Sequence, residues 1–157
     1  KTDFLKLFEQ LGNSVTNEEL THFFSKSKGK KISKGNQLLG FPYLVLDLIR
    51  EFDLDSGCNI RFVSWFGHGL YCCVFLGKQM PQPDRLFSED GFLLGRNDLP
   101  WDLAAQVDWI QAGNKTPENQ GEARLWIKEI ELVGEQANCL QILRDELKKI
   151  LLANPAE

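Results

Sequence analysis

The sequence is poor in the features that mark membrane, metal and nucleotide proteins. No apolar run approaches the ~18–20 residues that cross a bilayer, which predicts that the protein has no membrane span. The four cysteines form no C-x-x-C pair and there are only two histidines, so the usual zinc-binding pattern is missing. The strings G-x-x-x-x-G-K-[ST], G-x-G-x-x-G, H-E-x-x-H and G-x-S-x-G are also absent. We therefore expect no metal and no cofactor, and no motif favours the common nucleotide-binding or hydrolase classes.

Length and composition predict one globular domain that spans residues 1–157. Hydrophobic residues make up 43% and charged residues 25%, a balance that is not typical of disordered or fibrous chains. The four cysteines are Cys58, Cys72, Cys73 and Cys139. Two of them lie inside the apolar segment 70–76, where cysteine commonly acts as a small hydrophobe. Because the start of the chain does not resemble a signal peptide, we expect reduced cysteines and a cytoplasmic protein.

The charges are unevenly distributed. The chain carries −4 in total, yet five lysines and no acid fall within nine residues, which leaves −9 for the rest. Such a basic segment can contact phosphates. Serine and glycine interrupt these lysines and no aromatic residue offers a stacking platform, so the pattern favours a solvated loop over a nucleic-acid site. The five are Lys26, Lys28, Lys30, Lys31 and Lys34.

Four helices are predicted from apolar spacing and capping signals. Residues 3–11 form the first, and a second begins near Thr16, where Thr16 and Glu19 make a capping box. A third runs from a cap at Asp98 to about residue 112, with a proline in its first turn. Residues 136–152 form an amphipathic C-terminal helix. The serine-, glycine- and lysine-rich stretch 25–36 reads as a long loop.

A β-hairpin is the clearest strand signal. Residues 60–66 and 70–76 are apolar, β-favouring runs joined by Gly-His-Gly at 67–69. Pairing Phe66 with Leu70 would place Trp65 opposite Tyr71 and Arg61 opposite Phe75. Both faces of the hairpin are largely apolar, which predicts a covered position inside a sheet.

The remaining segments complete an α+β fold. Residues 41–53 fit either a helical stripe or a buried strand. Residues 123–133 read as a strand with a bulge between Lys128 and Ile130, and residues 92–94 as a short strand. The aspartates at 53–57 resemble the opening of a calcium loop, but the glycine comes one position early, so we expect a plain turn. We expect an antiparallel sheet built around the central hairpin, with the helices packed on one face of it.

Six residues near the hairpin are candidates for ligand binding. Trp65 and Tyr71 would be cross-strand neighbours whose polar atoms need partners, and one polar end is expected to meet water or a ligand. His68, at the hairpin tip, would be exposed and could titrate near neutrality. For each of these residues a purely structural role is also open: core packing for the aromatics and turn geometry for the histidine. The six are Asp47, Arg50, Arg61, Trp65, His68 and Tyr71.

The same region resembles a family of small uncharacterised bacterial proteins. Members carry G-[LF]-P-[YW]-x-x-L-D, a nearby arginine and an I-R-x-x-x-[FW]-[FW]-G hairpin. This chain has GFPYLVLD at residues 40–47, Arg50, and IRFVSWFGHGLY at residues 60–71, together about a fifth of its length. The family has no known activity, so the resemblance implies no catalytic residue. Members often have a proline where this chain has Ile49, a departure that leaves strand and helix open for 43–49 while favouring an extended segment.

Three functions follow as hypotheses. The first is a non-catalytic intracellular domain that binds a small molecule or a protein at the hairpin end. The second is a small hydrolase or isomerase that uses His68 with Asp47 or a cysteine, which requires these groups to converge in one pocket. The third is nucleic-acid contact through the Lys26–Lys34 loop. Self-association as a homo-oligomer is compatible with the sequence but not specified by it.

Overall fold

The computed structural model describes residues 2–96, 98, 101–114 and 122–153. It has an α+β fold with a six-stranded, fully antiparallel sheet, which confirms the predicted class. The strand order is β1-β2-β3-β4-β6-β5. The strands are β1 (Lys31–Leu38), β2 (Phe41–Glu51), β3 (Cys58–Trp65), β4 (Gly69–Leu76), β5 (Leu93–Leu94) and β6 (Arg124–Ile130). The helices are α1 (Phe4–Asn13), α2 (Asn17–Phe23), α3 (Asp84–Glu89), α4 (Leu103–Gln111) and α5 (Gln136–Leu152).

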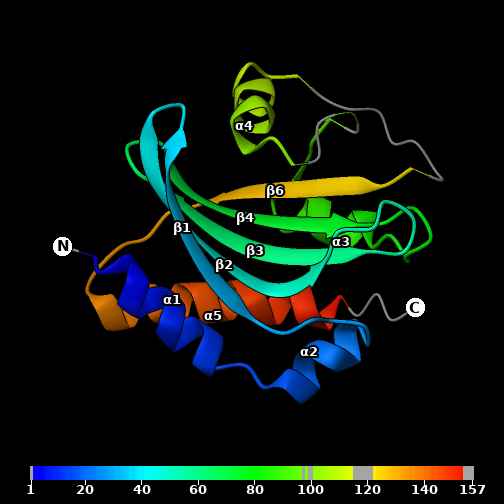
Figure 1. Ribbon diagram of the computed structural model, residues 1–157, viewed down its shortest axis with the longest axis horizontal. Coiled ribbons are helices and arrows are strands. Elements are labelled where there is room, and N and C mark those ends of the chain that lie inside the picture. Colours follow the sequence, from blue (N-terminus) through cyan, green and yellow to red (C-terminus); the bar gives the residue numbers. More distant parts are fainter. Residues whose placement is uncertain (1, 97, 99–100, 115–121, 154–157) are drawn as a thin grey trace.

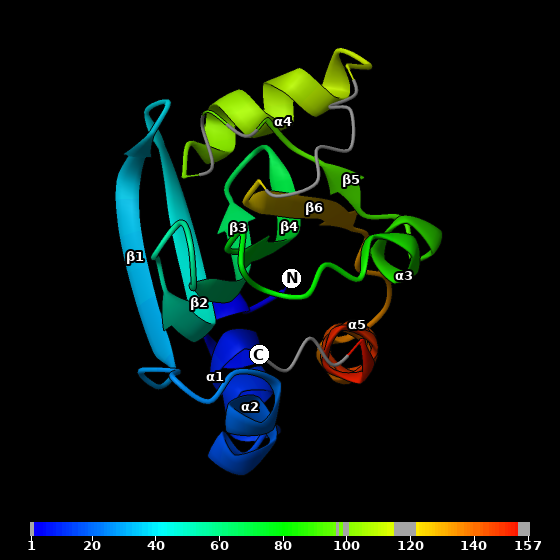
Figure 2. The same ribbon diagram turned by 90° about the vertical axis from the view of Figure 1, so that its right-hand side faces the viewer.

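Helices lie on both faces of the sheet. In Figure 1, α1, α2 and α5 lie below the sheet and α4 lies above it, and Figure 2 shows the same separation from the side. We call the two surfaces the α5 face and the α4 face. The larger core cluster fills the α5 face, and a smaller cluster that includes Val63, Phe75 and Val107 fills part of the α4 face. The expectation that all helices pack on one face was therefore wrong, because both faces of the central strands are apolar.

The central hairpin is confirmed, but its register differs from the predicted one. Trp65 pairs with Gly69 and Arg61 with Cys73, so the loop is Phe66-Gly67-His68. The amide of His68 donates to the carbonyl of Trp65 at 2.9 Å, and Gly67 takes a φ of +79° that favours glycine. The predicted pairings of Trp65 with Tyr71 and Arg61 with Phe75 were wrong by two residues. Face assignments survive, because a two-residue slip keeps every side chain on its own face.

Residues 41–51 form a strand, β2, with a bulge in its second half. The register with β3 shifts between Asp47 and Ile49, and both Leu48 and Ile49 are fully buried in the α5-face core. Two consecutive residues thus face the same side, which an unbulged strand does not allow. Asp47 stays on the α4 face, opposite Arg61.

Several local predictions need correction. Residues 31–38 form the edge strand β1 instead of continuing a loop. The register of β6 is regular, with no bulge between Lys128 and Ile130, because Lys128 lies on the α5 face, where its ammonium donates to Glu146 Oε1 at 2.6 Å. Helix α4 begins after Asp102, whose carboxylate accepts from the amide of Ala105 at 3.0 Å, and not after Asp98. Its predicted first-turn proline lies outside the described residues. The short helix α3 was not predicted.

Other expectations hold. Helices α1 and α2 occupy the predicted segments, and α2 has the expected capping box at Thr16 and Glu19. Helix α5 spans the predicted residues. The 53–57 segment is a turn in which the carboxylate of Asp53 accepts from two amides at 2.8 and 2.9 Å. These bonds lower the pKa of Asp53.

Candidate functional site

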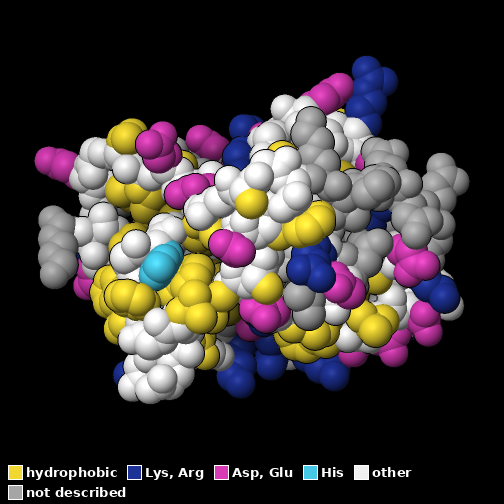
Figure 3. Space-filling view, turned by 90° about the horizontal axis from the view of Figure 1, so that it is seen from above, with side chains coloured by type: hydrophobic (Ala, Val, Ile, Leu, Met, Phe, Trp, Pro, Cys, Tyr) yellow, Lys and Arg dark blue, Asp and Glu magenta, His cyan; other side chains and the backbone are white. Residues whose placement is uncertain are grey.

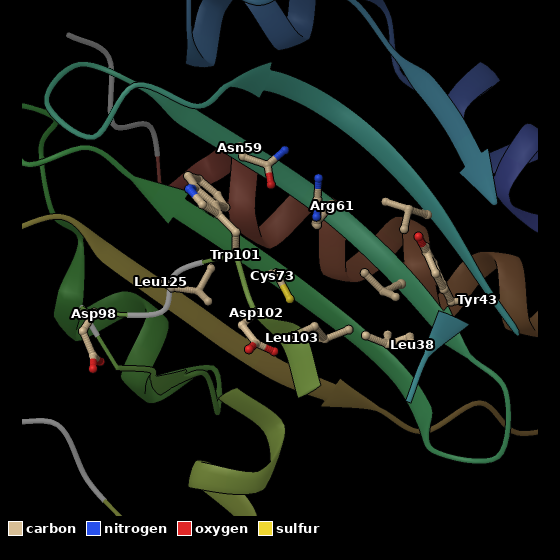
Figure 4. A pocket seen from close by; sticks show the side chains of 12 residues that line it. Leu38, Tyr43, Asn59, Arg61, Cys73, Asp98, Trp101, Asp102, Leu103 and Leu125 are labelled. Carbon is tan, nitrogen blue, oxygen red and sulfur yellow. The ribbon is translucent and has the colours of Figure 1, made fainter. Parts of the chain in front are cut away.

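A pocket of about 580 Å³ opens on the α4 face of the sheet. Its floor comes from β2, β3, β4 and β6, and its walls come from the ends of β1 and β2 and from the residues that lead into α4 (Figure 4). Its volume falls within the roughly 300–1,000 Å³ of small-molecule sites. We call it the sheet pocket. It is lined by Leu38, Tyr43, Val45, Asn59, Arg61, Val63, Cys73, Asp98, Trp101, Asp102, Leu103 and Leu125.

A polar network is set into this otherwise apolar floor. Asp47 is 5% exposed, and its Oδ1 accepts from Arg61 Nε and from Asn59 Nδ2, each at 2.9 Å. Arg61 Nη2 donates to Asp47 Oδ2 at 3.3 Å, so the arginine binds the carboxylate in a bidentate manner. Asn59 also donates to the carbonyl of Ile49 at 2.7 Å, beside the bulge. The three side chains lie on one face because Arg61 is opposite Asp47 and two residues from Asn59.

Aromatic rings border the arginine. Its guanidinium carbon lies 5.5 Å from the ring centroid of Phe52, a cation–π distance. Trp101 packs edge-on against Phe52 at 5.0 Å and is tilted against Phe75 at 4.4 Å. The indole of Trp101 therefore forms a wall that is held by two other rings, yet Trp101 remains 43% exposed. In Figure 4 the Trp101 and Arg61 side chains both lie over the sheet at the pocket.

The pocket rim carries carboxylates whose contacts are local. Asp98 binds Arg96 at 2.6 Å, and Asp102 caps α4. Arg96 in turn lies 5.1 Å from the ring centroid of Trp109. The charge of Arg61 is balanced by Asp47, so the described lining carries no unbalanced cation.

Three further sequence candidates form a separate cluster at the end of the central hairpin. The ring of His68 stacks on Trp65 at 4.0 Å and meets Phe41 edge-on at 4.7 Å. His68 is half-buried, so the expectation of an exposed imidazole was wrong. Trp65 Nε1 donates to the carbonyl of Leu38 at 3.0 Å, and the Tyr71 hydroxyl donates to the carbonyl of His68 at 2.8 Å. The polar atoms of both aromatic side chains thus have backbone partners. Figure 3, which views the molecule from above, shows groups of hydrophobic side chains exposed on this surface.

Arg50, the sixth candidate, belongs neither to the sheet pocket nor to the cluster at the hairpin end. Its Nε and Nη2 donate to the carbonyls of Gly29 and Lys28 at 3.0 and 3.3 Å. Arg50 therefore ties the chain that enters β1 to β2. Of the six candidates, the structure brings Asp47 and Arg61 together at the pocket, places three at the hairpin end, and uses Arg50 elsewhere.

The groups required by the hydrolase or isomerase hypothesis do not converge. Arg61, the strand partner of Asp47, is four residues from Trp65 on β3, which is roughly 13 Å along the strand and away from His68. All four cysteines are free and buried. Burial raises the pKa of the Cys73 thiol to about 12, with Arg61 opposing the shift. A thiol with that pKa is a poor nucleophile at neutral pH.

Sequence reasoning missed most of the pocket. Asn59 carried a usable signal, because a polar residue two positions from Arg61 in an apolar strand must share its face. Tyr43 lay in the quoted strings but was not singled out. Trp101 was assigned to a helix, whereas it precedes α4 and its position depends on Phe52 and Phe75. No local sequence signal predicts that contact.

A second charged cluster lies on the α5 face, away from the sheet pocket. Lys128 Nζ lies 2.6 Å from Glu146 Oε1 and 3.3 Å from Asp90, and Lys149 reaches the same Asp90 oxygen at 3.2 Å. Burial, reinforced by Asp90, raises the pKa of Glu146 to about 7, although Lys128 opposes the shift. The cluster holds β6, α5 and the end of α3 together, and its role is therefore structural.

Two negative findings concern the described residues. No group of three or more His, Cys, Asp or Glu among them is placed to hold a metal ion. Nor does any helix in this part of the chain have the length and apolar character needed to cross a membrane.

Comparison with known proteins adds no relative. No protein-family model, no curated protein and no solved structure matches this chain.

Proposed function

We propose that the protein is a non-catalytic domain that binds a small molecule in the sheet pocket. The observation that carries the proposal is Arg61, which is held by the buried Asp47 and lines a pocket whose other side chains are mainly apolar and aromatic. Ligand sites combine these two features, because apolar walls supply affinity and a few fixed polar groups supply orientation. Arg61 is partly exposed and uses Nε and Nη2 on Asp47, so guanidinium donors remain for a ligand oxygen.

The lining favours a neutral, flat ligand with one hydrogen-bond acceptor. Asp47 balances the charge of Arg61, and Asp98 and Asp102 stand at the rim, so an anion gains little electrostatic attraction. The indole face of Trp101 suits a flat ring, since aromatic pairs contribute about 0.5–1.5 kcal/mol beyond area burial. An amide or ketone oxygen would complete the match with Arg61.

We further propose a bacterial, cytoplasmic protein. The four buried cysteines without disulfides support a reducing compartment. The resemblance of residues 40–47 and 60–71 to the bacterial family supports the source.

The test uses 2-naphthamide, a neutral flat ring with an amide oxygen, and naphthalene as the matched probe without the acceptor. Binding is followed by protein NMR shifts and ligand-observed NMR. We expect 2-naphthamide to bind about tenfold more tightly than naphthalene, the factor that corresponds to one additional hydrogen bond of about 1.4 kcal/mol. Shifted resonances should map to the sheet pocket.

Paired variants locate the contacts. Asp47→Asn/Arg61→Met should abolish the preference for the amide, whereas Arg85→Met/Glu89→Gln, an exposed ion pair, should retain it. Trp101→Ala should weaken both probes, with Leu93→Ala as the exposed apolar control. Binding that maps elsewhere, or that the Trp101 and Arg61 variants leave unchanged, would refute the proposal.

A further inference from the structure

We infer that the free edge of β1 is a docking site for an extended acidic segment of a partner protein, which adds to the sheet as a further strand. This inference is independent of the sheet pocket. Strand β1 is eight residues long, stands at one end of the strand order and pairs with β2 alone among the described strands. The other end of the sheet is the two-residue β5, which is too short for such pairing. A long free edge presents unpaired main-chain groups that an extended peptide can satisfy.

A groove runs beside this edge on the α5 face. It measures about 570 Å³ and lies where β1 and β2 pass the first residues of α1. Ile32 and Leu44 contribute from the strands, Leu5 from α1 and Phe66 from the hairpin loop. Leu5 and Phe66 are 51% and 56% exposed, so their apolar surface is open. When a peptide adds to a sheet edge, every second side chain enters a pocket on one face, and this groove is placed to receive them.

The positive charge of two exposed lysines on β1 favours an acidic partner. Lys31 and Lys34 are exposed on β1, and no ion pair joins either of them to another described residue. Two neighbouring lysines are already occupied: Lys30 Nζ donates to the carbonyls of Gly12 and Val15 at 2.8 and 2.9 Å, and Lys28 pairs with Glu51 at 3.4 Å. In the register Lys31 is opposite Asp47, on the α4 face, and Lys34 is opposite Leu44, on the α5 face. Lys31 and Lys34 thus remain for one acidic side chain on each face of an incoming strand.

The same lysines disfavour two other occupants. Two copies of β1 paired edge to edge would bring lysines close to lysines, and such like-charge contacts are destabilising. Nucleic acid would match the charge, but two lysines supply few phosphate contacts and the groove beside them is mainly apolar. A segment with acidic residues on the α4 face, and with apolar residues and one acid on the groove face, satisfies the main chain, both lysines and the groove together.

The experiment titrates the full chain with the acetylated, amidated peptide DVEFDEVI, which has acidic residues on both faces of the strand, and with its charge-swapped partner KVKFKKVI. Amide hydrogen exchange is followed with and without peptide. We expect the acidic peptide to protect amides of residues 31–38 and the basic one to give no protection. Lys31→Glu/Lys34→Glu should weaken the acidic peptide at least about tenfold, because two opposite-charge contacts become repulsive.

Control variants separate position from total charge. Arg144→Glu/Lys148→Glu makes the same change in net charge on the exposed surface of α5 and should leave peptide affinity unchanged. Leu5→Ser removes apolar surface from the groove and should weaken binding without affecting the helical circular dichroism signal, since Leu5 is half exposed.

Three results would overturn the inference. The first is an absence of protection in β1 with the acidic peptide. The second is a dimer whose formation protects β1, measured by sedimentation with increasing protein concentration. The third is binding of a single-stranded oligonucleotide, but not of the peptide, that is lost in Lys31→Glu/Lys34→Glu.

Discussion

The Asp47–Arg61 pair yields the sharpest stability prediction. Replacing Arg61 by Met leaves the 5% exposed carboxylate of Asp47 with the Asn59 amide as its one side-chain donor among the described residues. Breaking a buried pair by removing one partner costs about 3–5 kcal/mol. Arg61 is 26% exposed and Asn59 still donates, so we expect about 2–3 kcal/mol for Arg61→Met. The stem of Met replaces most of the apolar contact of the arginine.

Asp47→Asn and the double variant complete a double-mutant cycle with Arg61→Met, and each is expected to lose a different amount of stability. Asp47→Asn leaves a guanidinium that can reach solvent, so its cost should be smaller, about 1–2 kcal/mol. In Asp47→Asn/Arg61→Met no charge remains unbalanced, and the loss should be about 1–2 kcal/mol in total. The coupling energy between the two sites is then about 2 kcal/mol.

Urea unfolding at neutral pH measures these quantities through tryptophan fluorescence and circular dichroism. The midpoints should shift while the slopes stay constant, which shows that stability and not the extent of unfolding has changed. The exposed Arg85–Glu89 pair is the matched control, and its coupling should be only about 0.3–0.5 kcal/mol. Additive effects of Asp47→Asn and Arg61→Met would show that the two charges do not stabilise each other and would refute the reasoning.

Three other predictions concern local features. The pKa of Glu146 is raised from 4.5 to about 7 on folding, so its contribution to stability is fully present below pH 4.5 and is lost as the pH rises through 7. Glu146→Gln should therefore remove about 2 kcal/mol of the decline in unfolding free energy between about pH 5 and 8, measured by urea titration. An unchanged decline would contradict this prediction. Leu39 is 68% exposed and has a φ of +51°, so Leu39→Asn should stabilise by about 0.5–1 kcal/mol in thermal unfolding; a lower melting temperature would argue against this. A Cβ at Gly57 would lie 2.3 Å from main-chain oxygens, so Gly57→Ala should lower the free energy of unfolding in urea by at least about 3 kcal/mol. In the control Gly12→Ala the nearest atom to the new Cβ is 3.7 Å away, so the free energy of unfolding should not fall. Equal effects of the two substitutions would refute the steric argument.

Elements with local signals could be predicted from the sequence. The capping box of α2 and the apolar spacing of α5 act within a few residues, and both helices lie where expected. The edge strand β1 has no such signal. Its lysines, serine and glycine are typical of loops, and the strand exists because β2 supplies its hydrogen bonds and Ile32 packs on the core.

The register of the β3–β4 hairpin could not be predicted from the hairpin sequence. Gly67 and Gly69 both take positive φ values, at +79° and +118°, so glycine placement alone allows a loop centred on either side of His68. The observed register aligns β3 with its other neighbour as well, because Arg61 must meet Asp47 on β2 and Cys73 on β4. Register is therefore determined by three strands together, and the hairpin sequence cannot determine it alone.

The bulge in β2 explains both the ambiguous reading of residues 41–53 and the position of the candidate site. Leu44, Leu48 and Ile49 all belong to the α5-face side of the strand, and this spacing imitates one side of a helix. With residue 48 in place and unbroken alternation, Ile49 would lie on the α4 face, as Asp47 does. The bulge instead turns Ile49 into the core while its carbonyl accepts from Asn59, the residue that also holds Asp47. One irregularity thus fills the core on one face and completes the polar network on the other, which is why neither feature could be derived from periodicity.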